Sequence, residues 1–197
     1  MDKNIKVYIT GASRGLGLSL SKNLPYNIFS STRDKGFDIE KNYDFVLNSI
    51  IESDADVFIN NAYAPLYQTK LLNDVYNSWE YLNKQIINIG SCASDMDLDN
   101  PLRDNEYPKN KIDQENIIKK INVDYCVTGY KNNVKCRVTN IKMGYVNTEF
   151  PSLLDKRLFP NLDTNYVSSV VQWIIEQPSN INIREISIHS TNTPELK

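Results

Sequence analysis

Two residues near the middle of the chain have the types and the spacing needed for acid–base chemistry. In the segment EYPKNK, Tyr107 precedes Lys111 by four residues, a spacing that can put both side chains on one face of a helix. A free phenol is a poor acid or base near neutral pH because its pKa is about 10, and a neighbouring cation lowers that pKa. The chain holds 12 tyrosines and 16 lysines, so about one such pair is expected by chance. The rest of the sequence must therefore decide whether this pair is functional.

A glycine-rich turn near the N-terminus has the composition of a dinucleotide-binding loop. The segment TGASRGLG (10–17) lies between a strand-like run and a helical segment, as such loops require. Gly11 permits a tight turn, Gly15 lets the backbone approach a pyrophosphate, and Gly17 lets the helix pack on the sheet. The free N–H groups of that helix favour a phosphate. Because three of the seven glycines of the chain stand in this turn, a ligand-binding role is favoured over a plain turn.

Two arginines favour NADP(H) over NAD(H) as the dinucleotide. Arg14 lies inside the turn, and Arg33 ends the second strand-like run, where cofactors without a 2′-phosphate usually meet an acid. Guanidinium groups match the geometry of a phosphate. Both arginines could instead be solvated surface residues, and Asp34 could neutralise Arg33. NAD(H) is therefore the second choice.

These candidate residues depend on an alternation of strand-like and helix-like segments. Strand-like runs cover residues 5–10, 27–33, 55–60, 85–91, 135–144 and 184–190, and residues 36–39 could add a short third strand. Helical spacing covers the segment from the glycine turn to Leu24, and residues 43–51, 71–84, 109–121 and 165–176. Strands separated by helices imply right-handed βαβ units. We therefore expect a Rossmann-like, doubly wound α/β fold in which a parallel sheet lies between two helical layers.

Three side chains have positions that this pattern predicts in more detail. Pro108 is expected at the first position of its helix, and it disfavours the α conformation at the residue before it. Tyr107 is therefore expected at the helix cap and not within the first turn. The rings of Trp79 and Trp173 are expected to lie in the core.

Composition and charge exclude several functional classes. A hydrophobic content of 41% with 23% charged residues is typical of a soluble globular chain, and we expect one domain over residues 1–197. The net charge of −2 argues against a nucleic-acid-binding protein. No signal-peptide core and no membrane-spanning apolar run are visible, so no membrane partner is expected. Three cysteines without Cys-x-x-Cys spacing and a single histidine, His189, argue against disulfides and metal sites and favour a cytoplasmic location.

From the first strand to nearly the C-terminus, the chain resembles the short-chain dehydrogenase/reductase family, with its motifs in the family's order. TGASRGLG is similar to the family's cofactor turn, and Asp38 in GFDIE is similar to the acid that faces the adenine. NNAY (60–63) resembles the Asn-Asn-Ala-Gly stretch, and INIGS (87–91) resembles the strand that ends in the catalytic serine. Tyr107 and Lys111 match Tyr-x-x-x-Lys, and MGYVNT (143–148) resembles the segment that holds the nicotinamide amide.

The resemblance implies a role for each matching residue. Ser91 would bond the substrate oxygen, and Tyr107 would give or take its proton while a hydride passes between the nicotinamide and the carbonyl carbon. Lys111 would hold the nicotinamide ribose. The implied cofactor-binding residues are Thr10, Gly11, Ser13, Arg14, Gly15, Leu16, Gly17, Arg33, Asp38, Ile39, Asn60, Asn61, Ala62, Tyr107, Lys111, Gly144, Val146 and Thr148.

Two of the implied catalytic positions have alternatives. The family's catalytic asparagine belongs to the helix expected at residues 71–84, where Asn73 and Asn77 are both candidates and we take Asn73. Ser94 is an alternative to Ser91, which is preferred because it lies at the strand end. Cys92 is interpreted as filler beside that serine, and His189 as a structural residue at a strand end.

Departures from the family pattern keep other functions open. Tyr63 stands where the family has glycine and Met143 where it has proline, and the third strand with its helix looks trimmed. The leading hypothesis is an NADP(H)-dependent carbonyl reductase or alcohol dehydrogenase. The alternatives are a non-catalytic NADP(H)-binding sensor or scaffold, and an epimerase or dehydratase that retains its cofactor.

The substrate and the assembly are less constrained by the sequence. Residues 149–163 are expected to form a loop that covers the substrate, and their mixture of apolar and charged side chains fits a small carbonyl or alcohol compound. Relatives pair through their two long central helices, which match residues 71–84 and 109–128 here. A homo-oligomer is therefore the default expectation.

Overall fold

One parallel sheet of six strands forms the centre of the structure, in the order β2-β1-β3-β4-β5-β6. This computed structural model describes residues 4–97, 99–127, 135–147 and 161–191. The strands are β1 (Lys6–Thr10), β2 (Asn27–Ser31), β3 (Val57–Asn60), β4 (Gln85–Ile89), β5 (Arg137–Met143) and β6 (Glu185–Ile188). The strand order reverses at β1, so the carboxyl ends of β1 and β3 border the crevice where such folds bind ligands. The expected Rossmann-like α/β fold is confirmed.

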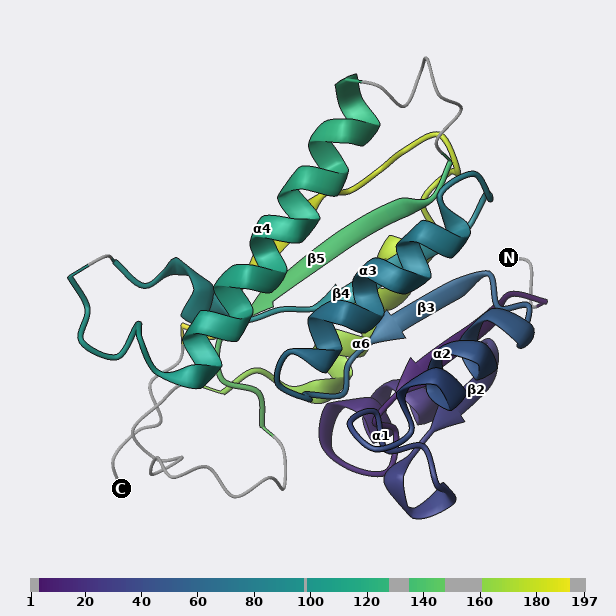
Figure 1. The fold of residues 1–197 in the computed structure, drawn as a ribbon, viewed down its shortest axis with the longest axis horizontal. Helices are drawn as coiled ribbons and strands as arrows, with labels where there is room; N and C mark the ends of the chain where they lie inside the picture. The colour runs from purple at the N-terminus through teal and green to yellow at the C-terminus, as the bar shows by residue number, and fades with distance from the viewer. Residues whose placement is uncertain (1–3, 98, 128–134, 148–160, 192–197) are drawn as a thin grey trace.

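Helices cover both faces of this sheet, as Figure 1 shows. On one face lie α2 (Tyr43–Glu52), α3 (Tyr67–Trp79) and α4 (Glu106–Val127). On the other face lie α1 (Gly15–Asn23) and α6 (Thr164–Ile175). Two short 3-10 turns, η1 (Arg33–Lys35) and η2 (Cys92–Asp95), follow the carboxyl ends of β2 and β4.

Two apolar cores separate these three layers. Residues of β1 and β5 pack with α1 and α6 on one side, and residues of β3 and β4 pack with α2, α3 and α4 on the other. Every residue of β3, β4 and β5 is buried, because both faces of these central strands are covered. Trp79 is 1% exposed at the second core, but Trp173 is 51% exposed, so the expectation of a buried Trp173 ring was wrong.

The expected short strand at residues 36–39 does not form. Gly36 has φ +84°, and the N–H of Phe37 donates to the carbonyl of Thr32 at 3.1 Å. These features close a turn around η1, after which the chain enters α2. In the described part of the chain, β2 therefore pairs with β1 and is an edge of the sheet.

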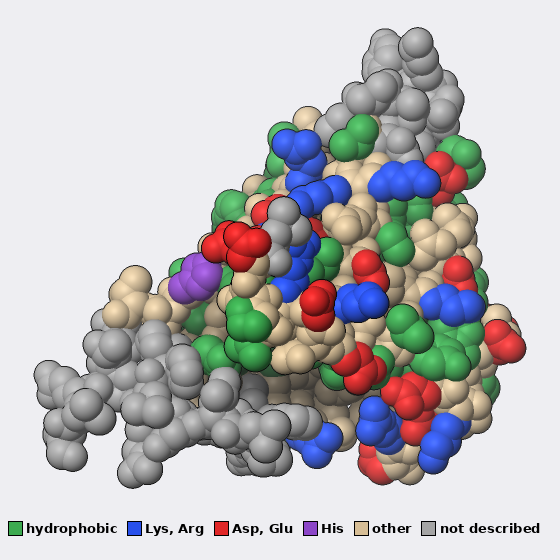
Figure 2. Space-filling model, turned by 60° about the vertical axis from the view of Figure 1, so that its left-hand side comes forward, with side chains coloured by type: hydrophobic (Ala, Val, Ile, Leu, Met, Phe, Trp, Pro, Cys, Tyr) green, Lys and Arg blue, Asp and Glu red, His purple; other side chains and the backbone are tan. Residues whose placement is uncertain are grey.

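The face drawn in Figure 2 carries Lys and Arg side chains that alternate with Asp and Glu side chains. The chain's single histidine lies on this surface beside acidic side chains. Across the described residues, no helix combines the length and the apolar composition that crossing a membrane requires.

Candidate active site

The glycine turn after β1 uses each of its three glycines differently. Gly11 and Gly15 have φ of +73° and +56°, which are left-handed values that favour glycine. Gly17 lies inside α1, where a Cβ would stand 2.2 Å from the Gly11 carbonyl oxygen and 2.6 Å from Asn61 Nδ2. The start of α1 is thus packed against the turn with no room for a side chain.

Thr10 and Asn61 join this turn to the segment that follows β3. The Thr10 hydroxyl oxygen accepts hydrogen bonds from the backbone N–H groups of Asn61 and Ala62, each at 3.1 Å. Asn61 Nδ2 donates in return to the carbonyl of Thr10 at 2.9 Å and to that of Gly11 at 3.3 Å. The asparagine stretch therefore holds the glycine turn at the end of β1.

A cleft of about 930 Å³ runs from the glycine turn to Tyr107. Eleven of the predicted cofactor-binding residues line it: Gly11, Ser13, Arg14, Gly15, Leu16, Gly17, Arg33, Ile39, Asn61, Ala62 and Tyr107. Arg14 and Arg33 are exposed at this cleft, and Asp34 lines it beside them. The positions favoured for a 2′-phosphate are thus brought to one cavity, together with one acid.

Other predicted cofactor-binding residues lie around the cleft and not among its lining. Asp38 caps a turn, because its Oδ1 accepts hydrogen bonds from the backbone N–H groups of Glu40 at 3.1 Å and Lys41 at 3.4 Å. Thr10 and Asn60 are fully buried behind the turn. Gly144 and Val146 follow β5, and Thr148 lies outside the described residues, as does most of the predicted substrate loop at 149–163.

Ser91 lies at the carboxyl end of β4, with its side chain close enough to the phenol of Tyr107 to lower the pKa of that phenol. Its hydroxyl oxygen also accepts from the N–H of Ala93 at 3.1 Å, which caps η2. The alternative, Ser94, donates to the Ser91 carbonyl at 2.8 Å. The structure therefore brings Ser91 to Tyr107 and engages Ser94 elsewhere.

The Tyr107 ring is partly exposed, at 43%, but its hydroxyl end lies among other side chains. Burial raises the pKa of Tyr107 above its ordinary value, the Ser91 side chain opposes this rise, and Tyr63, Cys92 and Tyr145 add to it. The Tyr63 ring packs edge-on against the Tyr107 ring with 5.1 Å between centroids. The phenol is therefore protonated at neutral pH.

Lys111 is 5% exposed and lies beneath these two rings. Its Nζ stands 5.6 Å from the ring centroid of Tyr63 and 5.8 Å from that of Tyr107. Nζ donates to Gln68 Oε1 at 3.0 Å, to the carbonyl of Ile89 at 3.0 Å, and to Gln114 Oε1 at 3.3 Å. Burial lowers the pKa of Lys111 to about 7. All three donors of the ammonium are thus bonded to protein groups, with none directed at a cofactor ribose.

The helix that carries this pair begins earlier than the sequence indicated. α4 starts at Glu106, so Tyr107 lies in its first turn, and Pro108 is not the first helical residue. The expected cap position of Tyr107 was wrong. Proline is tolerated in a first turn because the N–H groups there have no partner within the helix, and the bias against α conformation before proline is not absolute. The same-face geometry of Tyr107 and Lys111 therefore holds.

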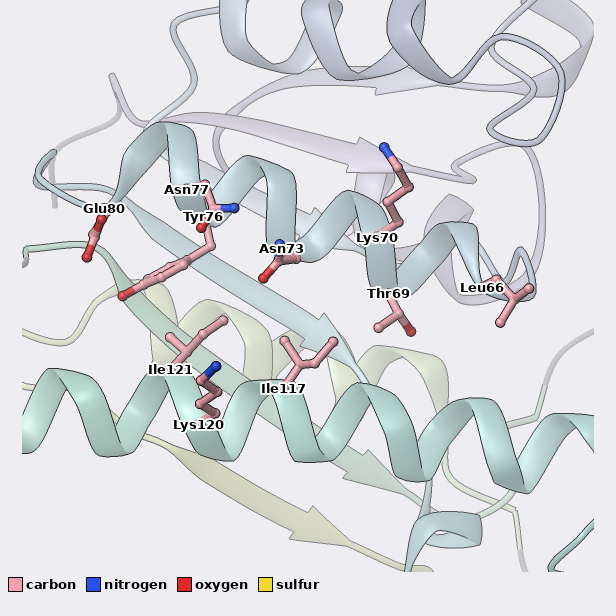
Figure 3. A pocket seen from close by; sticks show the side chains of 10 residues that line it. All are labelled: Leu66, Thr69, Lys70, Asn73, Tyr76, Asn77, Glu80, Ile117, Lys120 and Ile121. Atoms are coloured by element: carbon pink, nitrogen blue, oxygen red, sulfur yellow. The ribbon is translucent and has the colours of Figure 1, made fainter.

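Asn73 is not brought to this site. It lines a separate groove between α3 and α4 together with Asn77, Ile117 and Lys120, as Figure 3 shows. The residue of α3 that reaches Lys111 is Gln68, which the sequence interpretation did not include. Nothing in the sequence marked Gln68 as part of the site, because the helix was expected to begin at residue 71. In the structure α3 begins at Tyr67, so Gln68 lies in its first turn.

The segment after β5 meets the end of β6. The N–H of Gly144 donates to the carbonyl of Ile188 at 3.1 Å. His189 lies beside it, with Nε2 at 3.5 Å from Cys92 Sγ. Burial raises the pKa of Cys92, which disfavours the reactive thiolate form at neutral pH. Across the described residues, no group of three or more His, Cys, Asp or Glu side chains could hold a metal ion.

Comparison with solved structures identifies the architecture. A serine dehydrogenase complexed with NADP+ matches with a TM-score of 0.69 at 17% identity, over 93% of this chain and 94% of that chain. A short-chain dehydrogenase/reductase from Vibrio parahaemolyticus matches with a TM-score of 0.69 at 14% identity, over 94% of this chain and 100% of that chain. The chain has the short-chain dehydrogenase/reductase fold. The resemblance inferred from the motifs is thereby confirmed for the fold.

A third protein with this short-chain dehydrogenase/reductase fold binds a different cofactor. A 4-hydroxyisoleucine dehydrogenase complexed with NADH matches with a TM-score of 0.64 at 18% identity, over 95% of this chain and 97% of that chain. No family model and no curated protein matches the sequence.

Proposed function

We propose that the protein is an NADP(H)-dependent oxidoreductase that transfers a hydride between the nicotinamide and a small carbonyl or alcohol compound. One observation carries this proposal. The phenol of Tyr107 lies beside Ser91 and above Lys111, at one end of the same cleft that begins at the glycine turn. An acid–base phenol, a hydroxyl and a cation are the groups that carbonyl reduction needs at the substrate oxygen.

The cofactor proposal rests on the shape and charge of the cleft. At Gly17 a side chain would collide with the turn, so the backbone is held close to where a pyrophosphate would meet the start of α1. Arg14 and Arg33 line the same cleft and favour a 2′-phosphate. Solved structures of this fold contain either NADP+ or NADH, which supports a nicotinamide cofactor of either type. The arginines decide our choice of NADP(H).

The side chains of this site suit reduction of a carbonyl. The cofactor supplies the hydride, and the remaining steps belong to protein groups. Ser91 donates a hydrogen bond to the carbonyl oxygen, and Tyr107 gives that oxygen a proton as it becomes an alcohol. Because burial keeps the phenol protonated, Tyr107 is ready as the acid. The Lys111 ammonium beneath the ring stabilises the phenolate left behind.

The substrate proposal follows from the neighbours of the Tyr107 hydroxyl. The Tyr63 ring packs against the Tyr107 ring, and Cys92 and Tyr145 lie near enough to its phenol to raise the pKa of Tyr107. None of these three neighbours is a carboxylate, a lysine or an arginine. A small, partly apolar aldehyde or ketone fits such walls better than a strongly charged compound.

Replacing Tyr107 by phenylalanine tests this function. We expect NADPH oxidation with a panel of small aldehydes and ketones to fall at least about 100-fold, because the proton donor is lost. NADPH binding, followed by fluorescence, should change by less than about threefold, since the ring remains. Tyr166→Phe removes the hydroxyl of an exposed tyrosine on α6 and is the matched control. Equal activity of Tyr107→Phe and wild type would contradict the proposal.

A second candidate is a non-catalytic NADP(H)-binding sensor. The observation that favours it is the complete use of the three Lys111 donors by Gln68, Gln114 and the carbonyl of Ile89. A sensor would bind NADPH tightly and turn over none of the carbonyl panel. The placement of Ser91 beside the Tyr107 phenol argues against it, because a sensor has no need for these two side chains to lie together.

A further inference from the structure

A row of buried asparagines crosses the sheet beneath Lys111. The strand register pairs Asn60 of β3 with Asn88 of β4, and Asn88 with Asn140 of β5. All three side chains are at most 2% exposed. Asn60 Nδ2 donates to Asn88 Oδ1 at 3.0 Å, and Asn88 Nδ2 donates to Asn140 Oδ1 at 2.8 Å. The row is therefore a continuous chain of amide hydrogen bonds inside the protein.

Two glutamines connect this row to the ammonium of Lys111. Gln114 Oε1 accepts from Asn88 Nδ2 at 3.1 Å and from Lys111 Nζ at 3.3 Å. Gln68 Oε1 accepts from Lys111 Nζ at 3.0 Å, while Gln68 Nε2 donates to the carbonyl of Asn60 at 3.2 Å. Each glutamine thus presents its oxygen to the lysine and is anchored to the sheet by a second bond.

The direction of these amides is set by the donors around them. Turning the Gln114 amide round would point its NH₂ group at two other donors, Lys111 Nζ and Asn88 Nδ2. In the observed direction, Gln114 Nε2 is buried without a hydrogen-bond partner among the described residues, and so is Asn60 Oδ1. Buried polar atoms without partners destabilise a fold. The observed amide directions therefore give the Lys111 ammonium its acceptors, while Gln114 Nε2 and Asn60 Oδ1 are left without hydrogen bonds within the described part of the chain.

The charge of Lys111 depends on these neutral acceptors. Among the described residues, no carboxylate forms an ion pair or a hydrogen bond with Lys111. The titratable groups that face it are the phenols of Tyr63 and Tyr107. Burial disfavours the charged form, whereas hydrogen bonds to the charged form favour it. Two of the three acceptors of the ammonium are amide oxygens of side chains, and the third is the backbone carbonyl of Ile89. Only the contribution of the two amide oxygens to the pKa of Lys111 can therefore be changed by substitution.

We propose that Gln68 and Gln114 are positioning residues that keep the Lys111 ammonium charged and centred beneath the Tyr107 ring. The backbone carbonyl of Asn60 fixes the direction of the Gln68 amide, and the Asn88 side chain fixes that of the Gln114 amide. The inference rests on the proposed function, in which Tyr107 is the proton donor that this charge serves. At 3.3 Å, the bond to Gln114 is the longest of the three, so it is the one that Lys111 would release to meet a hydroxyl of a bound cofactor.

The test is a pH titration of Lys111 by NMR, in protein labelled with ¹³C at the lysine Cε. The signal of Lys111 is assigned by its absence in Lys111→Met. Gln68→Met keeps the side-chain length and removes one acceptor, so we expect the pKa of Lys111 to fall by about one to two pH units. Gln114→Glu keeps both of its acceptor contacts and loses no donor contact, since Nε2 has no partner, and its negative charge should raise that pKa by about one pH unit or more.

Gln85→Met is the matched control, since Gln85 is a buried glutamine at the start of β4 that is not bonded to Lys111. It should leave the Lys111 titration unchanged. A purely structural role for the glutamines predicts no opposite shifts, so an unchanged pKa in both variants, or a shift in the same direction, would overturn the proposal. If Gln68→Met does not fold, an unchanged pKa in Gln114→Glu is sufficient to overturn it. The titration requires no turnover, so failure of the proposed reductase function is seen separately, in the Tyr107→Phe assay.

Discussion

Replacing Gly17 by alanine tests how closely α1 packs on the glycine turn. A Cβ there would stand 2.2 Å from the Gly11 carbonyl oxygen and 2.6 Å from Asn61 Nδ2. In a helix with open space, the change from glycine to alanine stabilises by about 1 kcal/mol. Here it overpacks the turn, at a cost of about 1–3 kcal/mol, and displaces Asn61 from two hydrogen bonds worth about 0.5–1.5 kcal/mol each. We expect a net destabilisation of about 1–5 kcal/mol.

Urea denaturation of wild type and Gly17→Ala measures this difference in unfolding free energy. NADPH binding should weaken in the same variant, because the start of α1 must move away from the turn. Lys22→Ala changes an exposed residue of the same helix and should stay within about 0.5 kcal/mol of wild type. If Gly17→Ala were as stable as wild type and bound NADPH equally well, the close packing described for this turn would be refuted.

Three other perturbations give measurable outcomes. Arg33→Ala should weaken NADPH binding about 10- to 100-fold in a fluorescence titration while changing NADH binding little, because only NADPH carries the 2′-phosphate. Lys142→Met removes a 4% exposed cation that stands 3.2 Å from Glu115 Oε2, and should cost about 3–5 kcal/mol in urea denaturation. Burial opposes ionisation of Glu115, but hydrogen bonds led by that from Lys119 hold its pKa below 4.5. The ionised carboxylate of Glu115 therefore stabilises the folded state above pH 4.5, and this stabilisation is lost as the pH falls through the folded-state pKa. In Lys142→Met the free energy of unfolding should therefore depend less steeply on pH over this range than in wild type. Acid unfolding followed by circular dichroism measures this dependence. Asn88→Leu removes the three hydrogen bonds that Asn88 makes with Asn60, Gln114 and Asn140, and should destabilise the protein by at least about 2 kcal/mol, measured by thermal unfolding.

The sheet could be predicted because its strands are short apolar runs bounded by turn residues. The runs that became β1, β3, β4 and β5 are buried on both sides, and such strands read as nearly continuous hydrophobic segments. The glycine turn could be predicted because strand, turn and helix follow one another in the sequence. In these elements the local sequence pattern is sufficient to predict where the residues lie in the fold.

The errors fall where backbone geometry overrides local pattern. The segment at 36–39 has the apolar content of a strand, but Gly36 adopts a left-handed conformation that ends the run in a turn. The first turn of α4 accepts Pro108 because its N–H group would have had no helical partner there. Trp173 lies on the outer side of α6, whose buried residues include Val167, Val171 and Ile174, so an aromatic residue in a helical pattern did not imply burial.

The residues that hold Lys111 could not be predicted from the sequence. Gln68 and Gln114 belong to no motif, and a buried glutamine is identified only by what lies around it. The contacts depend on the register of three strands and on the start of α3, and neither is fixed by local spacing. Tyr107 and Ser91 could be predicted to meet only because the motifs that carry them follow a known order along the chain.

The missing third strand affects the behaviour of the protein at high concentration. In the described part of the chain β2 pairs only with β1, so its other side presents backbone hydrogen-bonding groups, beside a Phe29 ring that is 41% exposed. An open strand edge with an exposed aromatic side chain is a template for strand addition between molecules. Aggregation during expression or concentration would therefore begin at β2, and a lysine in place of Phe29 is the substitution most suited to prevent it.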